Sequence, residues 1–512
     1  MKRTAIFVGA LILLELFSFG LQVHQRGFYH DDWVHLEYLS SMAPDSFIDA
    51  FRVHLPRGHW SRPVLMLFIP FFYALGGLNP LPYQAGMLLL ECITGILLFI
   101  ALRAATRETA ASWIAAAVFL IYPNRACTHF WWIVSVSSLS TALLAAAFCF
   151  HILGVKRRGR PYALPAALCY LTALLTYEAT MGWIVWLAVY EYWRRHDDSG
   201  QARALNALRA LTPYLAAFAV LFLHQRVLVP ALLPDSFAKL MHFSARHVIW
   251  TFAKAAHCMT TGPLWLSLKS LADAAAFMSL GKGALLAAAA AAAAYALHHA
   301  PPVKSPRRTA PLFIGGGVLM FFAAYAPYAA SGNYAPDMLS LMNRLNTGGA
   351  FAAGLVAAGL YLLLTVRVRT AVFTTALVLA TTANWHASQE WTESWTLQQR
   401  VVGRVRPHLA AIPEERAVLL LAGVPNMIGT AIVFDSYWDF DRMLKTASGR
   451  KSLQANIMSH RITHDPQEVR EESGGQVLQR YPYTNLWIYR YDLDRLLPVT
   501  SEEEFAAALP PT

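Results

Sequence analysis

The sequence has few charged residues for its length. Asp, Glu, Lys and Arg together make up 14% of the 512 residues, whereas 56% of the residues are hydrophobic. This is far more apolar surface than a soluble domain needs to fill its core. The composition therefore excludes an ordinary soluble globular protein and predicts a chain whose solvent is lipid.

Paired cysteines are also missing. No two cysteines have CxxC spacing, and the hydrophilic C-terminal part contains none; the five are Cys92, Cys127, Cys149, Cys169 and Cys258. Metal-binding and disulfide-rich domains usually show such spacings. The cysteines therefore indicate neither a zinc site nor a disulfide framework.

No basic domain accounts for the formal charge of +11, because the Lys and Arg residues are dispersed between hydrophobic runs. Nucleic-acid binding needs a concentrated basic surface, so we expect no nucleic-acid partner. In membrane proteins, dispersed Lys and Arg are typical of cytoplasmic loops and of contacts with anionic lipid headgroups. Membrane lipid is the expected environment.

The N-terminus lacks a cleavage signal. Lys2 and Arg3 precede an apolar run from Thr4 to about Leu21, but no small-x-small site stands before His24. A secretory signal peptide would carry such a site. The run is therefore interpreted as an uncleaved first membrane span.

Long apolar runs dominate the first three quarters of the chain. A helix needs about 20 mostly apolar residues to cross roughly 30 Å of hydrocarbon. About eleven spans are predicted from the runs Thr4 to Val23, Tyr83 to Leu102, Ala110 to Tyr122, Trp131 to Val155, Pro161 to Thr176, Ala179 to Trp193, Leu208 to His224, Gly281 to Leu297, Ala310 to Ala326, Ala350 to Thr365 and Ala371 to Ala383.

Basic residues fall into alternate gaps between these runs, which orients the molecule. The N-terminus is expected in the cytoplasm, whereas residues 25–82, named here the first outer loop, and the C-terminal part are expected outside. Two further apolar stretches, Pro63 to Leu75 and His247 to Leu266, would invert the alternation if they crossed. They are interpreted as helices that lie on or dip into the outer leaflet.

The composition changes at His386, after which charged residues appear throughout. A helix is expected from Ser388 to Val405, and short strands at Ala417 to Leu421 and Asn485 to Tyr491, which are rich in β-formers and bounded by turn residues. The fold prediction is a polytopic, all-α membrane bundle over residues 1–385 and a small extracytoplasmic α/β domain over residues 386–512.

Two adjacent acids, Asp31 and Asp32, follow the first span among aromatic residues. Such a pair can bind a divalent cation, or one member can take a proton from an attacking hydroxyl. The alternative is a solvated helix N-cap, because Asp caps helices well and the following residues look helical.

Other ionisable residues stand near the outer ends of spans. Arg62 could hold a phosphate in a fork geometry or anchor the chain to headgroups, and Arg344 is a second cation of the outer face. Glu178 lies at the outer end of a span, where an ionisable group is a functional candidate. Glu15 and Glu91 lie deeper, where hydrogen bonding within the bundle is expected.

The order of these features resembles the membrane portion of GT-C glycosyltransferases. It is most similar to protein O-mannosyltransferase relatives of the tetratricopeptide-bearing transmembrane type and their bacterial homologues, over roughly Thr4 to Trp193. Two departures are that the usual His-Pro is here Tyr-Pro and that the usual Lys-Glu or Arg-Glu is Tyr-Glu; no tetratricopeptide period follows. The resemblance is carried by the acidic pair, Arg62-Pro63, Gly77-Leu78-Asn79-Pro80 with Tyr83, Tyr122-Pro123 with Trp132, and Tyr177-Glu178.

The resemblance implies a GT-C fold and a sugar transferase of the hexosyl or mannosyl type that uses a polyprenyl-phosphate sugar donor and inverts the anomeric carbon. Asp31 or Asp32 would serve as the base, and Glu178 would orient the acceptor or the acidic loop. No cofactor is required, although a divalent metal on the acidic pair stays open. The acceptor, whether glycan, lipid or protein, is unassigned. The donor phosphate would be clamped by Arg62, Arg125 and Arg344.

Short loops and the resemblance to bacterial members favour a bacterial cytoplasmic (inner) membrane. Two other functions are compatible with the sequence. A secondary transporter would relay protons through Glu15 and Glu91, but no inverted repeat is seen. A non-catalytic assembly subunit of GT-C architecture would tolerate replacement of Asp31 and Asp32.

Overall fold

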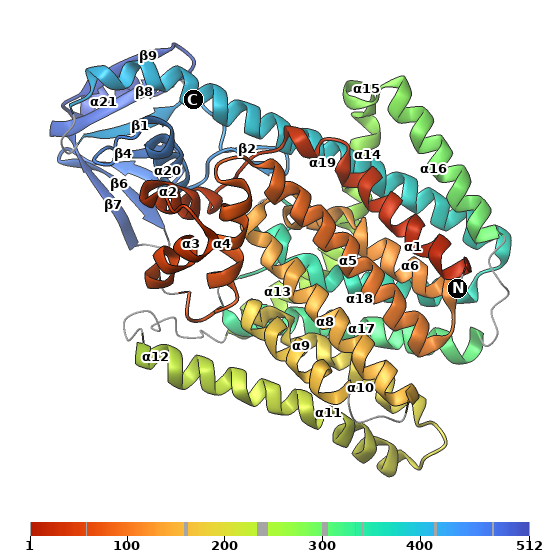
Figure 1. The fold of residues 1–512 in the computed structure, drawn as a ribbon. Coiled ribbons are helices and arrows are strands. Elements are labelled where there is room, and N and C mark those ends of the chain that lie inside the picture. Colours follow the sequence, from red (N-terminus) through yellow and green to blue (C-terminus); the bar gives the residue numbers. More distant parts are fainter. Residues whose placement is uncertain are drawn as a thin grey trace.

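The computed structural model describes residues 2–57, 59–157, 162–232, 244–298, 306–332, 334–339, 341–413, 417–473 and 476–510. Long helices form a bundle on one side of the molecule, and a sheet-containing domain formed by the C-terminal residues lies at the opposite end (Figure 1). The helices of the first outer loop lie beside this domain. The described residues thus form the predicted helical bundle with a small C-terminal domain.

Eight helices of the described residues are long and apolar enough to cross a membrane. Each of them falls on a predicted apolar run, so the chain is an integral membrane protein of polytopic helical architecture. They contain α1 (Lys2–Glu15), α5 (Leu81–Thr106), α8 (Val136–Arg157), α11 (Gly200–Leu223), α16 (Leu280–His298), α17 (Pro306–Ser331), α18 (Thr347–Leu363) and α19 (Val366–His408).

The other three predicted spans are shorter helices. α6 (Thr109–Leu120), α9 (Ala163–Thr176) and α10 (Ile184–Arg194) have 12, 14 and 11 residues. At 1.5 Å per residue they are about 17–21 Å long, less than the hydrocarbon thickness. α6 is packed between α5 and α18, where a side chain at Gly354 would collide with the Ala115 carbonyl oxygen. Small residues here allow two helix backbones to approach closely.

Neither of the two ambiguous apolar stretches forms one long helix. The first is α4 (Leu65–Gly76), which has 12 residues. The second is divided at Thr260 into α13 (Ala245–Met259) and α14 (Thr261–Ala272). Because neither stretch forms a helix of 18 or more residues, leaving both out of the count of spans agrees with the structure.

The first outer loop is helical. α2 (Asp32–Met42) begins directly after the acidic pair, as expected, and α3 (Phe47–His54) and α4 follow. A left-handed backbone at His30, with φ of 47°, turns the chain into α2. After this turn, Asp31 contacts Trp438 of the C-terminal domain.

α19 is a single helix of 43 residues and therefore about 65 Å long. It is continuous through residues 385 and 386, where the sequence predicts the domain boundary. The predicted span and the predicted helix from Ser388 onward are thus one element. Its C-terminal half packs on the first outer loop, where the rings of Trp395 and Trp33 stack 6.1 Å apart.

The C-terminal domain has a four-stranded sheet in the order β4-β1-β8-β9. β1 (Val418–Ala422) pairs in parallel with β4 (Gln454–Ile457) and with β8 (Leu486–Arg490), and β9 (Arg495–Val499) is antiparallel to β8. Both predicted strands, which correspond to β1 and β8, are confirmed. The domain also contains β2 (Met427–Ile428) with β3 (Ala431–Ile432), the antiparallel sheet β5 (Ile462–His464), β6 (Glu468–Ser473) and β7 (Gln476–Pro482), and the helices α20 (Tyr437–Ser448) and α21 (Glu502–Ala508).

One hydrophobic core joins the first outer loop to the C-terminal domain. Leu36 of α2 and Phe440 of α20 are both fully buried within it. At its edge, Arg442 donates to Glu37 across 3.1 Å. α20 therefore covers the start of α2, which carries the acidic pair.

Candidate active site

The two adjacent acids have different surroundings. Asp32 is fully buried, and its two carboxylate oxygens accept the backbone N–H groups of Tyr29, at 3.0 Å, and Ile133, at 2.9 Å. Burial raises the pKa of Asp32 to about 8, although the two N–H groups act in the opposite direction. Asp32 thus connects the first outer loop to Ile133, 101 positions away in the sequence. Its carboxylate is not accessible to a substrate.

Asp31 remains accessible, with 36% of its side chain exposed. One of its oxygens accepts Nε1–H of Trp438 at 2.9 Å and lies 2.9 Å from Nδ1 of His30. Burial alone would raise the pKa of Asp31, but His30 and then Arg344 lower it to about 2. Asp31 is therefore an ionised, oriented carboxylate at neutral pH.

His30 and Trp438 were missed in the sequence analysis. The His30 ring lies between Trp131 and Trp438, at centroid distances of 5.2 and 5.4 Å. Burial lowers the pKa of His30, but the charge of Asp31 and its hydrogen bond raise it more, so the net shift is upward. His30 and Asp31 form an ion pair that stabilises the ionised carboxylate.

Replacing His30 by glutamine is expected to move the acidic limb of the pH–activity profile to higher pH by about one to two units. Loss of the imidazolium raises the pKa of Asp31, so the carboxylate takes up a proton at a higher pH as the solution is acidified. The measurement is the initial rate of sugar transfer between pH 2 and 8 for the wild type and the variant. An unchanged acidic limb, with folded protein at every pH, would separate His30 from the ionisation of Asp31.

A pocket lies next to this group. Its cavity volume is about 10 Å³, room for about one water molecule, and many of its lining residues carry hydroxyl groups. Arg344 lines the pocket, and its guanidinium lies 5.5 Å from the Trp131 ring that also contacts His30. Arg344 therefore connects the pocket to the acidic pair. The other lining residues include Ser137, Thr141, Tyr177, Thr180, Tyr328 and Thr347.

Two predicted site residues, Arg62 and Glu178, form a bidentate ion pair. Nε and Nη2 of Arg62 donate to the two oxygens of Glu178 at 2.8 and 2.6 Å. Burial alone would raise the pKa of Glu178, but the effect of Arg62 is larger and lowers it overall. Both groups are therefore charged. The Arg62 guanidinium also lies 4.7 Å from the ring of Tyr177, which lines the pocket. The pair therefore borders the pocket, and the phosphate role of Arg62 stays a prediction.

Arg125, the third predicted phosphate ligand, is fully buried in the bundle. Its guanidinium pairs with Glu91, which also accepts a hydrogen bond from Ser138, and lies 4.2 Å from the Phe119 ring. Glu15 is buried nearby, 3.2 Å from His129. Glu91 thus has the expected hydrogen-bond partners, whereas neither carboxylate oxygen of Glu15 makes a hydrogen bond among the described residues. Arg125 does not line the pocket.

Unlike Arg62 and Arg125, Arg344 has no carboxylate oxygen within 4.0 Å among the described residues. Its donors are therefore available to an anion in the pocket. Of the six predicted site residues, Arg344 lines the pocket, and the Arg62–Glu178 pair contacts the lining residue Tyr177. Asp31 is connected to Arg344 through the rings of His30 and Trp131. Asp32 instead accepts hydrogen bonds from backbone N–H groups, and Arg125 forms an ion pair inside the helical bundle.

No protein-family model and no curated protein matches the sequence. Among solved structures, ArnT from Cupriavidus metallidurans bound to undecaprenyl phosphate aligns with a TM-score of 0.38 and 16% identity, over 89% of this chain and 86% of that chain. The apo form of the same ArnT aligns with a TM-score of 0.32 and 15% identity, over 90% and 86%. These alignments assign no function to this chain, and the O-mannosyltransferase resemblance stays a prediction.

Proposed function

We propose that this integral membrane protein is a GT-C glycosyltransferase that moves a sugar from a polyprenyl-phosphate donor to an acceptor hydroxyl on the extracytoplasmic face. Two observations support the proposal: Asp31 is ionised, with its pKa lowered by His30 and then by Arg344, and Arg344 lines a hydroxyl-rich pocket and has no carboxylate partner among the described residues. A carboxylate base and a phosphate-binding cation are the two groups that this reaction needs.

The donor phosphate would bind Arg344, with the Arg62–Glu178 pair at the border of the pocket. Guanidinium donors match phosphate oxygens and stabilise the negative charge that grows on the phosphate as it leaves. The hydroxyl groups of Tyr177 and Tyr328 supply further donors in the same pocket. The apolar polyprenyl chain would lie in lipid along the bundle.

The reaction proposed is a single displacement. The acceptor oxygen loses its proton to Asp31 and forms a bond to the anomeric carbon, while the bond between that carbon and the phosphate oxygen breaks. The electron pair of the broken bond leaves on the phosphate. Attack from the face opposite to the leaving group inverts the configuration, and no second carboxylate is needed as a nucleophile.

The contacts support structural roles for Asp32 and Arg125. Asp32 positions the loop, because both of its oxygens accept backbone N–H groups. Arg125 stabilises the bundle through Glu91. The sugar is proposed to be of the hexosyl or mannosyl type, and the protein to reside in a bacterial inner membrane with its N-terminus in the cytoplasm.

Replacing Arg344 by glutamine is expected to lower kcat/KM for the donor about 10- to 100-fold, because a charged hydrogen bond contributes about 1.5–3 kcal/mol. The measurement is transfer of labelled sugar from a panel of polyprenyl-phosphate sugars by purified protein. Arg52→Gln is the matched control, since Arg52 belongs to the same outer region and its side chain is 74% exposed.

Equal transfer by the wild type and the Arg344 variant would remove Arg344 from the site. No transfer from any donor, with tolerance of replacement at Asp31, would instead favour the non-catalytic subunit. Proton-coupled uptake of a solute into vesicles that depends on Glu91 would favour the transporter.

A further inference from the structure

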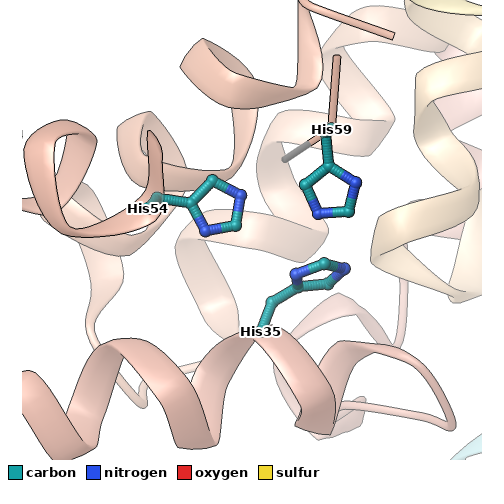
Figure 2. Close-up of side chains that lie close together, drawn as sticks. All are labelled: His35, His54 and His59. Carbon is teal, nitrogen blue, oxygen red and sulfur yellow. The ribbon is translucent and has the colours of Figure 1, made fainter. Parts of the chain in front are cut away.

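Three histidines of the first outer loop converge on one point. His35 belongs to α2, His54 is the last residue of α3, and His59 follows the short helix η3 (Leu55–Arg57). Their ring centroids lie 5.7, 5.2 and 5.3 Å apart, and one nitrogen from each lies within 4.8 Å of the others. Figure 2 shows the three rings facing a common space from three separate segments.

Several polar atoms of this cluster lack hydrogen-bond partners among the described residues. His54 is fully buried, and neither of its ring nitrogens makes a hydrogen bond; Nδ1 of the buried His35 also makes none. Leaving a buried polar group without a partner costs about 1–3 kcal/mol. These unbonded nitrogens belong to His35 and His54, and a ligand in the space between the rings would satisfy one nitrogen from each of these two residues.

The charge state of the cluster suits a cation. Burial lowers the pKa of all three histidines; Arg57 adds to the shift in each, and the neighbouring histidines add to it in His35 and His54. Neutral imidazole is the form that binds metals. The charged groups that face the cluster are Arg57 and Arg62, which oppose a cation, and Asp31, which attracts one.

We propose that His35, His54 and His59 bind one divalent transition-metal ion of the zinc type. Three imidazoles with a fourth position left to water or another oxygen ligand form a common zinc arrangement, with Zn–N bonds of about 2.0–2.1 Å. An all-nitrogen ligand set disfavours Mg²⁺ and Ca²⁺, which prefer oxygen ligands.

This site differs from the metal that the sequence left open at the acidic pair. There, both oxygens of Asp32 accept backbone N–H groups, and one oxygen of Asp31 accepts from Trp438. The absence of paired cysteines also gave no sign of this site, because its ligands are histidines. Their spacing, with His59 five residues after His54, is the signal that the sequence offered.

The ion would fix the geometry of the first outer loop. His35 stands one helical turn after Asp32 on α2, and His59 stands three residues before Arg62. A metal that joins α2, α3 and the segment of His59 would therefore hold Asp31 and Arg62 at a constant separation. The metal is assigned a positioning role and takes no part in the bond-making steps.

The test uses the full-length protein, purified in detergent with an affinity tag that contains no histidine. Zinc per chain is measured by mass spectrometry after equilibration with micromolar Zn²⁺, and affinity by competition with a fluorescent chelator. The wild type is expected to hold one zinc per chain. His35→Gln, His54→Gln and His59→Gln are each expected to bind zinc at least about 100-fold more weakly, since even indirect partners of a metal site contribute 10–100-fold.

His24→Gln is the matched control, because His24 is exposed and lies outside the cluster. It is expected to retain one zinc per chain. Added zinc should raise the Tm of the wild type and of this control, but not that of the three cluster variants. Well under one zinc per chain in the wild type, or equal zinc affinity in the cluster variants, overturns the proposal.

If a cluster variant does not fold, X-ray absorption at the zinc edge of the wild type identifies the zinc ligands instead. Three imidazole nitrogens at about 2.0–2.1 Å are expected. A shell dominated by oxygen or sulfur would refute the three-histidine site. Both outcomes are independent of sugar transfer, so the metal proposal and the proposed function can fail separately.

Discussion

Replacing Asp31 by asparagine is expected to reduce the rate of sugar transfer by about 10²- to 10⁴-fold, the usual contribution of a general base. Asparagine keeps the size of the side chain and an oxygen that can accept the Trp438 N–H group, but it cannot take the acceptor proton. The measurement is the initial rate with purified protein, together with the Tm. A rate within threefold of the wild type would show that Asp31 is not the base.

Two variants make this test specific. Asp45→Asn, at an exposed acid of the same loop, should transfer sugar at the wild-type rate. Asp32→Asn should act on folding, because asparagine leaves one of two buried N–H groups without an acceptor, at about 1–3 kcal/mol. A stable Asp32 variant that has lost all transfer would reverse the roles given to the two acids.

Replacing Glu91 by glutamine is expected to destabilise the protein by about 3–5 kcal/mol. Arg125 would then remain as a buried charge without a counterion, inside a bundle where charge is especially costly. Arg125→Met should be destabilising for the same reason, since it leaves Glu91 unpaired. The measurement is unfolding in mixed detergent and denaturant, monitored by circular dichroism.

The double variant Glu91→Gln with Arg125→Met is the control. Both charges are then absent, so its stability should lie much closer to that of the wild type than either single variant does. If the double variant is stable but no longer binds the donor, Arg125 is a phosphate ligand after all. If it is stable and transfers sugar, the buried pair serves the bundle alone.

Helices were predictable because lipid imposes a simple rule on composition. Each long apolar run, such as Leu208 to His224 or Gly281 to Leu297, corresponds to a long helix. Strands β1 and β8 were predictable as well, because brief β-branched and aliphatic segments stand between turn residues. Hydrophobicity alone did not predict that helices such as α6 are short, because it does not distinguish a helix buried among helices from one that faces lipid.

The site was only partly predictable, because its groups meet across long stretches of sequence. The acidic pair stood out through its position after the first span. Its division into a buried Asp32 and an accessible Asp31 depends on the Ile133 N–H group and on Trp438, which lies 407 residues from Asp31. The pairing of Arg62 with Glu178 likewise joins residues 116 positions apart. No local pattern carries such information.

Because α19 is one continuous helix, it sets the rotational orientation of the C-terminal domain that follows it. Each residue of an α-helix turns the chain by about 100° and advances it by 1.5 Å. The face of the domain that carries Trp438 and Arg442 therefore depends on the number of residues in the helix that leads to it. Insertion or deletion of a single residue within α19 would rotate that face away from Asp31. The length of this helix therefore matters to the site as much as the side chains themselves.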